Sequence, residues 1–148
     1  MSKKLNMDQL QTIQMNGFAY ELLRDEVLPD LMGKELDRIL YWAGKSLARR
    51  YPLTSMEEII SFFEHAGWGH LLVVSENKHE MELQLSGPLI TERYRDKRNH
   101  TYQLEAGFLA QQVQQLRGAL TETYEEQKRR ADKVVFTMKW DSKDITEA

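Results

Sequence analysis

Apolar residues recur at helical spacing over Tyr102–Gly118, in the sequence YQLEAGFLAQQVQQLRG. With about 100° of rotation per residue, one narrow arc of this segment carries Tyr102, Ala106, Leu109, Val113 and Leu116. Leu104 and Phe108 make the first half apolar on its other sides too, whereas glutamines make the second half polar there. Gly107 costs a helix interior roughly 1 kcal/mol relative to alanine, which is typical of a position where another backbone comes close. We predict a central helix over residues 102–117, with its first half buried from two directions.

The first predicted helix, residues 8–23, has two apolar arcs instead of one. Asp8 with Gln11 three positions later is typical of a capping box, and Pro29 is expected to stop any continuation of the helix. The arcs comprise Leu10, Ile13, Gly17 and Tyr20 on one side, and Met15, Phe18, Ala19, Leu22 and Leu23 on the other. Because one domain face covers only one arc, either the helix is sandwiched within the domain or the second arc packs against a second copy of the protein.

Two more amphipathic helices are predicted before residue 68. Apolar residues of the segment 34–49 share a single arc that no proline interrupts, with Tyr41 and Trp42 on its two flanks. The next helix ends near Gly67 and carries its apolar face on Met56, Ile59, Ile60 and Phe63. Its start is a capping box, formed either by Thr54 and Glu57 or by Ser55 and Glu58.

Two hairpins are predicted from short apolar runs and alternating positions. Residues 70–75 are apolar and rich in β-branched side chains, and beyond a polar turn every second residue of 81–85 is apolar. Gly118 suits a helix C-cap, after which residues 120–125 begin a second hairpin. Its return strand has a buried face formed by Val134, Phe136, Met138 and Trp140. The charged residues 89–99 between the hairpins are consistent with one or two helical turns.

The grouping of these elements predicts an α+β fold. Two antiparallel hairpins form a four-stranded sheet, and about four helices pack on one of its faces. The 148 residues fit one domain, 1–148, in which 1–6 and 142–148 are expected to be disordered.

Composition removes several classes of function. The formal net charge of −3 favours neither nucleic acid nor an anionic membrane as a partner. The chain has no cysteine, so thiol catalysis, disulfides, iron–sulfur clusters and cysteine-based zinc sites are excluded. It has no apolar run long enough to span a bilayer and no leader-like apolar segment, so we expect a cytoplasmic protein.

The polar residues do not assemble into recognisable chemistry. None of the four histidines has a partner at helical metal-ligand spacing, so we expect no metal and no cofactor. The basic clusters 93–98 and 128–133 are mixed with acids, as on a solvated surface. We expect no catalysis; the best constellation for an enzyme would be His70, His79 and Tyr94.

Four phrases of the sequence resemble those of a known family. They are LEAGFLA at 104–110, LYWAGK at 40–45 and FTMKWD at 136–141, together with AGWG at 66–69. These phrases resemble the YslB-like proteins of bacilli, a family of unknown function, and the similarity covers nearly the whole chain.

A more distant similarity, carried by the helix glycines and the closing hairpin, extends to a superfamily. It holds the vinyl-reductase-type ligand domains, the TRAPP vesicle-tethering subunits and the haem nitric-oxide sensors. The resemblance implies an α+β fold that is often dimeric and commonly keeps an apolar cavity between helices and sheet. The closing turn EEQKRRADK lacks the cysteines usual in vinyl-reductase-type domains, and YRDKR at 94–98 departs from the haem-sensor signature Tyr-x-Ser-x-Arg. Haem and metal are therefore not implied, and any apolar ligand would be held without a covalent bond.

Two functions follow as hypotheses. The first is a non-catalytic interaction protein, a homodimer or a subunit of a small cytosolic assembly, with an interface formed by Met15, Phe18, Leu22 and Tyr41. The second is a carrier or sensor of an apolar, acyl-like small molecule, with a cavity lined by Trp42, Phe62, Trp68, Leu104 and Phe108. We expect these bulky side chains to fill the gap between helices and sheet, which favours the first hypothesis.

Overall fold

A computed structural model describes the backbone of residues 4–145 and the side chains of residues 4–141. The expected disorder of residues 1–3 and 146–148 lies outside this range. The main helices are α1 (Met7–Leu10), α2 (Gly17–Glu21), α3 (Leu28–Met32), α4 (Leu36–Arg50), α5 (Met56–His65), α6 (Pro88–Arg95) and α7 (Gln103–Arg117). A π-helix, η1 (Leu22–Val27), joins α2 to α3, and 3-10 turns lie at η2 (Gly33–Glu35) and η3 (Arg129–Ala131). The strands are β1 (His70–Glu76), β2 (Glu80–Ser86), β3 (Ala119–Lys128) and β4 (Lys133–Ile145).

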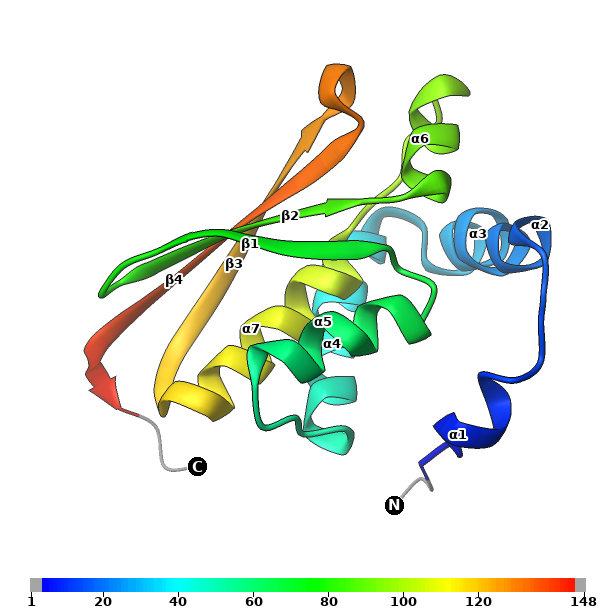
Figure 1. Cartoon of the computed structure of the whole chain (residues 1–148). Coiled ribbons are helices and arrows are strands. Elements are labelled where there is room, and N and C mark those ends of the chain that lie inside the picture. Colours follow the sequence, from blue (N-terminus) through cyan, green and yellow to red (C-terminus); the bar gives the residue numbers. More distant parts are fainter. Residues whose placement is uncertain (1–3, 146–148) are drawn as a thin grey trace.

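The strands form one antiparallel sheet in the order β1-β2-β4-β3, so the predicted α+β fold is confirmed. Helices α4, α5 and α7 lie on one face of the sheet (Figure 1). Each predicted hairpin forms, and the two hairpins join through β2 and β4, where Leu83 is opposite Phe136. β4 extends to Ile145, so residues 142–145 continue the sheet instead of forming the expected disordered tail.

Helices α4 and α7 meet backbone to backbone. A Cβ added to Gly107 would collide with the carbonyl oxygen of Tyr41, and one added to Gly44 would collide with the carbonyl oxygen of Leu104. Both glycines are therefore needed for close approach, as their position within helices predicts. Gly118 ends α7 in the left-handed conformation of a C-cap, with φ 70°.

An aromatic cluster closes the space between α5, α7 and the sheet. The rings of Phe62 and Phe108 are stacked with their centroids 4.6 Å apart, and Trp68 packs edge-on against Phe108 at 5.2 Å. Phe63 adds a second edge contact to Trp68 at 4.9 Å. Phe108 is fully buried. These contacts fill the volume that the sequence assigned either to core or to a ligand.

The N-terminal region departs from the predicted helix over residues 8–23. α1 is a single turn whose N-cap is Asn6, not Asp8, because the Asn6 side chain accepts from the backbone N–H of Gln9. A second helix begins only at Gly17, where Asn16 caps it by accepting from the backbone N–H of Ala19 at 2.9 Å. One continuous helix is replaced by two because each asparagine offers the backbone a local start.

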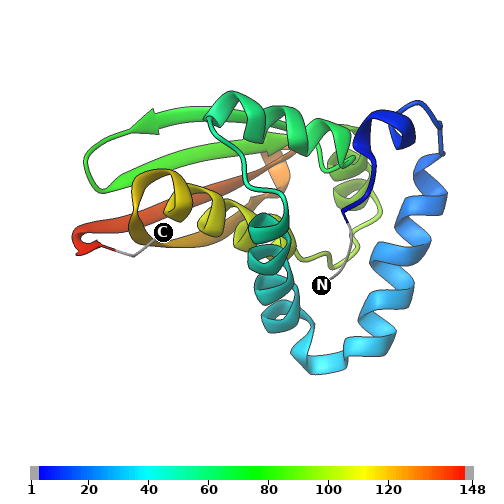
Figure 2. The same ribbon diagram turned by 90° about the horizontal axis from the view of Figure 1, so that it is seen from below.

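The prediction that Pro29 stops the helix is wrong. The chain passes from α2 through η1 into α3, with Pro29 in the first turn of α3 and Gly33 at its end. Within η1 the backbone N–H of Leu28 bonds to the carbonyl of Leu23, five residues earlier. The wider π turn accommodates a proline ring that would clash with the carbonyl four residues back in an α-helix. We call residues 17–32 the helical arm; in Figure 2 it diverges from α4 at the turn around Gly33.

The remaining helix ends follow the sequence signals. Ser55 caps α5 by accepting from the backbone N–H of Glu58, and Glu58 reaches back to Thr54, so the structure selects the second of the two predicted capping boxes. The charged segment after β2 forms the two turns of α6. No helix within residues 4–145 has the length and apolar character needed to cross a membrane.

Candidate functional site

The helical arm turns apolar side chains toward solvent. Phe18 is 72% exposed, and Leu22, Leu23, Val27 and Leu31 are exposed as well. The segment that leads into the arm adds Leu10, Ile13 and Met15. Large exposed apolar groups are far denser here than elsewhere on the described surface, and contiguous patches of this kind mark interaction sites.

The opposite side of the helical arm is charged and buried. Glu21 and Arg24 are the buried residues of α2 and η1, and α3 has no buried residue. The arm is thus an amphipathic helix with reversed polarity, because an ordinary surface helix turns its apolar side inward. This arrangement requires polar partners on the body of the protein.

A buried charge cluster supplies those partners. The guanidinium of Arg93, only 2% exposed, donates two hydrogen bonds to the Glu21 carboxylate at 2.7 and 2.8 Å. Arg24 donates to Glu105 of α7 at 2.6 Å. The cluster comprises Glu21, Arg24, Asp25, Arg93, Arg98, His100 and Glu105. Bidentate arginine–carboxylate bonds fix orientation as well as contact, so they set the angle of the helical arm on the body.

His100 and Asp25 close one end of the charge cluster. His100 Nδ1 is hydrogen-bonded to the Asp25 carboxylate, which also accepts from Arg98 at 2.9 Å. Burial lowers the pKa of His100; its bond to Asp25 opposes this effect, and the nearby Arg93 and Arg24 reinforce it. Burial alone would raise the pKa of Asp25, but the bond from His100 and the positive charge of Arg93 and Arg98 hold it below its ordinary value. The pair is therefore a neutral imidazole donating to a carboxylate.

The charge cluster is not evident from the sequence. The sequence predicts a solvated surface for Arg93 and Arg98, which is wrong for Arg93, because this side chain is buried against Glu21. The two partners are 72 residues apart in the sequence, so their pairing is not visible there. The available signal was on the arm itself, where Glu21, Arg24 and Asp25 are close in sequence within a segment otherwise rich in apolar residues. Such a group of charges indicates a polar counterpart but does not identify it.

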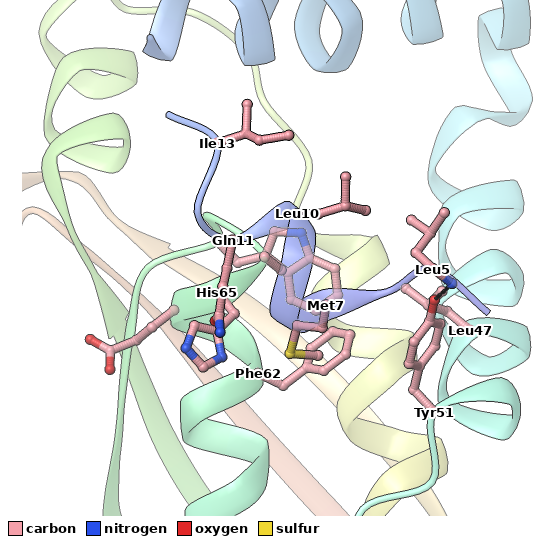
Figure 3. A pocket seen from close by; sticks show the side chains of 12 residues that line it. Leu5, Met7, Leu10, Gln11, Ile13, Leu47, Tyr51, Phe62 and His65 are labelled. Atoms are coloured by element: carbon pink, nitrogen blue, oxygen red, sulfur yellow. Dashed lines mark hydrogen bonds between the residues drawn. The ribbon is translucent and has the colours of Figure 1, made fainter. Parts of the chain in front are cut away.

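An apolar groove lies between the N-terminal segment and the body (Figure 3). Its volume is about 460 Å³. The N-terminal segment contributes Leu5, Met7, Leu10, Gln11 and Ile13, and the body contributes Leu47, Tyr51, Phe62, Glu64, His65, Ala66 and Trp68. Gln11 and His65 lie close together at one end of the groove. The backbone N–H of Leu5 donates to the Tyr51 hydroxyl at 2.7 Å and holds the segment in place.

The structure places the predicted cavity residues at separate positions. Phe62 and Trp68 line the apolar groove, whereas Phe108 lies behind them in the aromatic cluster. Leu104 is half-buried against the core beside Gly44. Trp42 is 66% exposed on α4 and contributes to neither the groove nor the cluster.

The predicted interface residues are also divided. Met15, Phe18 and Leu22 are all exposed on or just before the helical arm. Tyr41 is half-buried on α4, and its hydroxyl accepts from the backbone N–H of Thr123 in β3, so it belongs to the body.

The hypothetical catalytic constellation is not assembled. His70 opens β1 opposite Ser86, whereas His79 lies at the other end of the same hairpin, and the Tyr94 hydroxyl donates to the carbonyl of Lys133. Within the described part of the chain, no three histidine, aspartate or glutamate side chains gather as metal ligands would.

Comparisons with known proteins agree with the fold. The uncharacterized protein YslB of Bacillus subtilis (strain 168) is 51% identical over 139 residues, which cover 94% of each chain. The crystal structure of a vinyl-4-reductase family protein from Methanocaldococcus jannaschii matches with a TM-score of 0.53 at 21% identity, over 95% of this chain and 84% of that one. Both resemblances expected from the sequence are confirmed, the second as a likeness of fold. The model of a family described as "Protein of unknown function (DUF2507)" matches residues 17–139, so the chain belongs to that family.

Proposed function

We propose that this protein is a non-catalytic, cytoplasmic interaction protein that forms a homodimer through its helical arm. The observation that carries the proposal is the reversed polarity of the arm, whose charged side is buried while Phe18, Leu22 and Leu23 face solvent. An apolar helix surface held outward by buried ion pairs is suited to cover a second surface of the same character.

The charges around this surface favour a second copy over other partners. Glu26 and Asp30 are exposed on the helical arm, so phosphate backbones and anionic lipids would be repelled. Lys34 and Arg38 are exposed just beyond the end of the arm. In a two-fold pairing the same patch meets itself, so the apolar side chains of one arm cover those of the other and the charged residues remain at the rim.

Measurement of the molar mass in solution tests this proposal. Light scattering at micromolar concentration is expected to give twice the chain mass of 17.4 kDa. Replacing Phe18 and Leu22 together by serine should return the mass to that of one chain. Leu72→Ser is the matched control, since the exposure of Leu72 lies between those of Phe18 and Leu22 but Leu72 is on β1, and it should leave the dimer intact. A wild-type protein with the mass of one chain at every concentration would refute the dimer.

The apolar groove supports a second candidate function, non-covalent binding of an apolar small molecule with one polar end. Its volume of about 460 Å³ is within the range of ligand sites, which are mostly apolar with a few polar groups. Phe62 and Trp68 would contact the apolar body of such a molecule, and Gln11 with His65 would contact its polar end.

Binding of a long-chain fatty acid tests this candidate directly. Trp68 lines the groove, so saturable quenching of its fluorescence by added fatty acid is expected, while Trp42 and Trp140 should not respond. Leu10→Asp places a charge in the groove and should abolish the response, whereas Leu120→Asp on β3 should not. Unchanged fluorescence at saturating fatty acid, together with native mass spectra showing only the bare chain, would rule this candidate out.

A further inference from the structure

Charged groups fasten the helical arm to the body. Glu21 and Asp25 accept from Arg93 and Arg98, and Arg24 donates to Glu105. The apolar contribution of the arm to the core is small, because only the half-buried Tyr20 packs against it among the described arm residues. Separated ions regain their hydration, which offsets much of the loss when such contacts open. Undocking of this arm is therefore cheaper than undocking of a helix that buries an apolar face.

Each buried carboxylate of the charge cluster already has a guanidinium partner while His100 is neutral. Glu21, Asp25 and Glu105 face Arg93, Arg98 and Arg24, and the exposed Asp96 lies 3.6 Å from Arg98 at the edge of the cluster. A proton on His100 adds a positive charge beside Asp25, which already accepts from Arg98. His100 Nε2 is buried and has no hydrogen-bond partner, so the new N–H would also lack an acceptor.

Apart from Asp25, His100 is surrounded by an aromatic ring and by one polar depression. The Tyr102 ring packs against the imidazole with 4.6 Å between centroids. On the solvent side, a polar depression is lined by Asp37 of α4, Glu125 of β3 and Arg129 of η3. Glu125 is already engaged, because its carboxylate accepts from the Gln103 side chain and the backbone N–H of Tyr102.

We infer that the Asp25–His100 contact is an acid-sensitive latch, which keeps the helical arm docked while His100 is neutral and releases the arm when His100 takes up a proton. The consequence for assembly rests on the proposed function: a released arm no longer presents Phe18 and Leu22 as one fixed surface, so mild acid dissociates the dimer. His65, His70 and His79 are exposed and do not touch the arm contacts, so His100 is the histidine placed to act.

The direction of the pH effect follows from burial. Burial holds the pKa of His100 below its ordinary value near 6.5, so the undocked state binds the proton more readily than the docked state. The docked state is therefore favoured above that ordinary value and loses stability as the pH falls toward the lowered pKa. The pKa of Asp25 is lowered too, so its contribution has the same sign but is lost only in stronger acid.

Hydrogen exchange of the arm amides tests the latch without reference to assembly. After correction for intrinsic exchange rates, the opening equilibrium constant of the amides of residues 20–31 should rise below pH 6.5, by at most about tenfold for each unit by which the pH falls. The opening of the α7 amides should not change. The measurement is made on the wild type and on the Phe18→Ser/Leu22→Ser variant, which removes the proposed dimer contact but keeps the charge cluster. His100→Asn retains an N–H donor for Asp25 without a titrating ring and should abolish the pH response.

The outcomes separate the latch from the dimer. Accelerated arm exchange in both proteins supports the latch whether or not the wild type is dimeric. An arm that stays protected in acid, a response in which α7 opens equally, or a response that persists in His100→Asn would overturn it. The imidazole resonances of wild-type His100 give a measurement that needs no variant: their titration midpoint must match the midpoint of arm opening, and a mismatch contradicts the latch.

Discussion

Gly44 of α4 and Gly107 of α7 face each other across a backbone contact, in which each residue leaves room for a carbonyl oxygen of the other helix. The contact sets the distance between the two helices beneath the sheet. α4 begins directly after the turn at Gly33–Glu35 that follows the helical arm, so the helix packed against α7 is also the one joined to the arm.

Alanine at either position should destabilise the protein. Gly107→Ala or Gly44→Ala forces the helices apart, and overpacking of this kind costs about 1–3 kcal/mol or more in the free energy of unfolding. Urea denaturation measures the effect. Gly17→Ala is the control, because its Cβ would meet only the flexible Leu89 side chain, and it should stay within about 1 kcal/mol of the wild type. Equal effects at positions 17 and 107 would contradict the backbone contact.

Alanine substitutions at Phe108 and at Trp42 should have very different effects on the free energy of unfolding, although the sequence predicts both residues in one cavity. Phe108→Ala removes a fully buried ring that contacts Phe62 and Trp68, and should lower the free energy of unfolding by about 3–5 kcal/mol. Trp42→Ala removes an exposed side chain and should change it by no more than about 0.5 kcal/mol. A stable Phe108→Ala protein would show that the aromatic cluster is not part of the core.

Removing one partner of the Arg24–Glu105 pair should lower the free energy of unfolding much more than replacing both partners with apolar residues. Arg24→Met leaves Glu105, only 1% exposed, without its cation, and such losses cost about 3–5 kcal/mol. The double variant Arg24→Met/Glu105→Leu removes both charges and should recover most of that stability, as a double-mutant cycle would measure. A double variant no more stable than Arg24→Met would show that the charges are not coupled.

Ionisation of the buried Tyr102 phenol should destabilise the protein at alkaline pH. Burial raises the pKa of its phenol to about 12, although the neighbouring Arg93 opposes the shift. Because the unfolded phenol ionises near its ordinary pKa of about 10, the contribution of Tyr102 is complete below that pH and is lost as the pH rises toward about 12. Tyr94, whose pKa is also raised by burial, contributes with the same sign. Urea denaturation at rising pH should therefore show a shallower decline for Tyr102→Phe, and an unaltered decline would refute this assignment.

The sequence was sufficient for the elements that one periodic pattern controls. α7 and the return strand β4 have the predicted faces because their apolar residues repeat at helical and strand spacing. The course of the helical arm was not predictable, because Pro29 acts as a helix breaker only in α geometry and η1 provides a wider turn.

In the candidate site, too, local features were predictable from the sequence and tertiary contacts were not. Exposure of Met15, Phe18 and Leu22 followed from an apolar arc that the domain could not cover. The charge cluster did not follow, since Arg93, His100 and Glu105 are brought to Glu21 and Asp25 only by tertiary folding. The contact of Tyr41 with β3 did not follow from the sequence either, because its partner Thr123 lies 82 residues further along the chain.

Distances between spin labels, measured by pulsed electron paramagnetic resonance, test whether two copies meet through the helical arm. Because the chain has no cysteine, Leu23→Cys and Leu120→Cys each provide a single labelling site, one on the arm and one on β3. We expect strong intermolecular coupling for the label at 23, weaker coupling at longer distance for the label at 120, and loss of both when Phe18 and Leu22 are serine. No intermolecular coupling at 23, or a shorter distance at 120 than at 23, would contradict pairing through the arm.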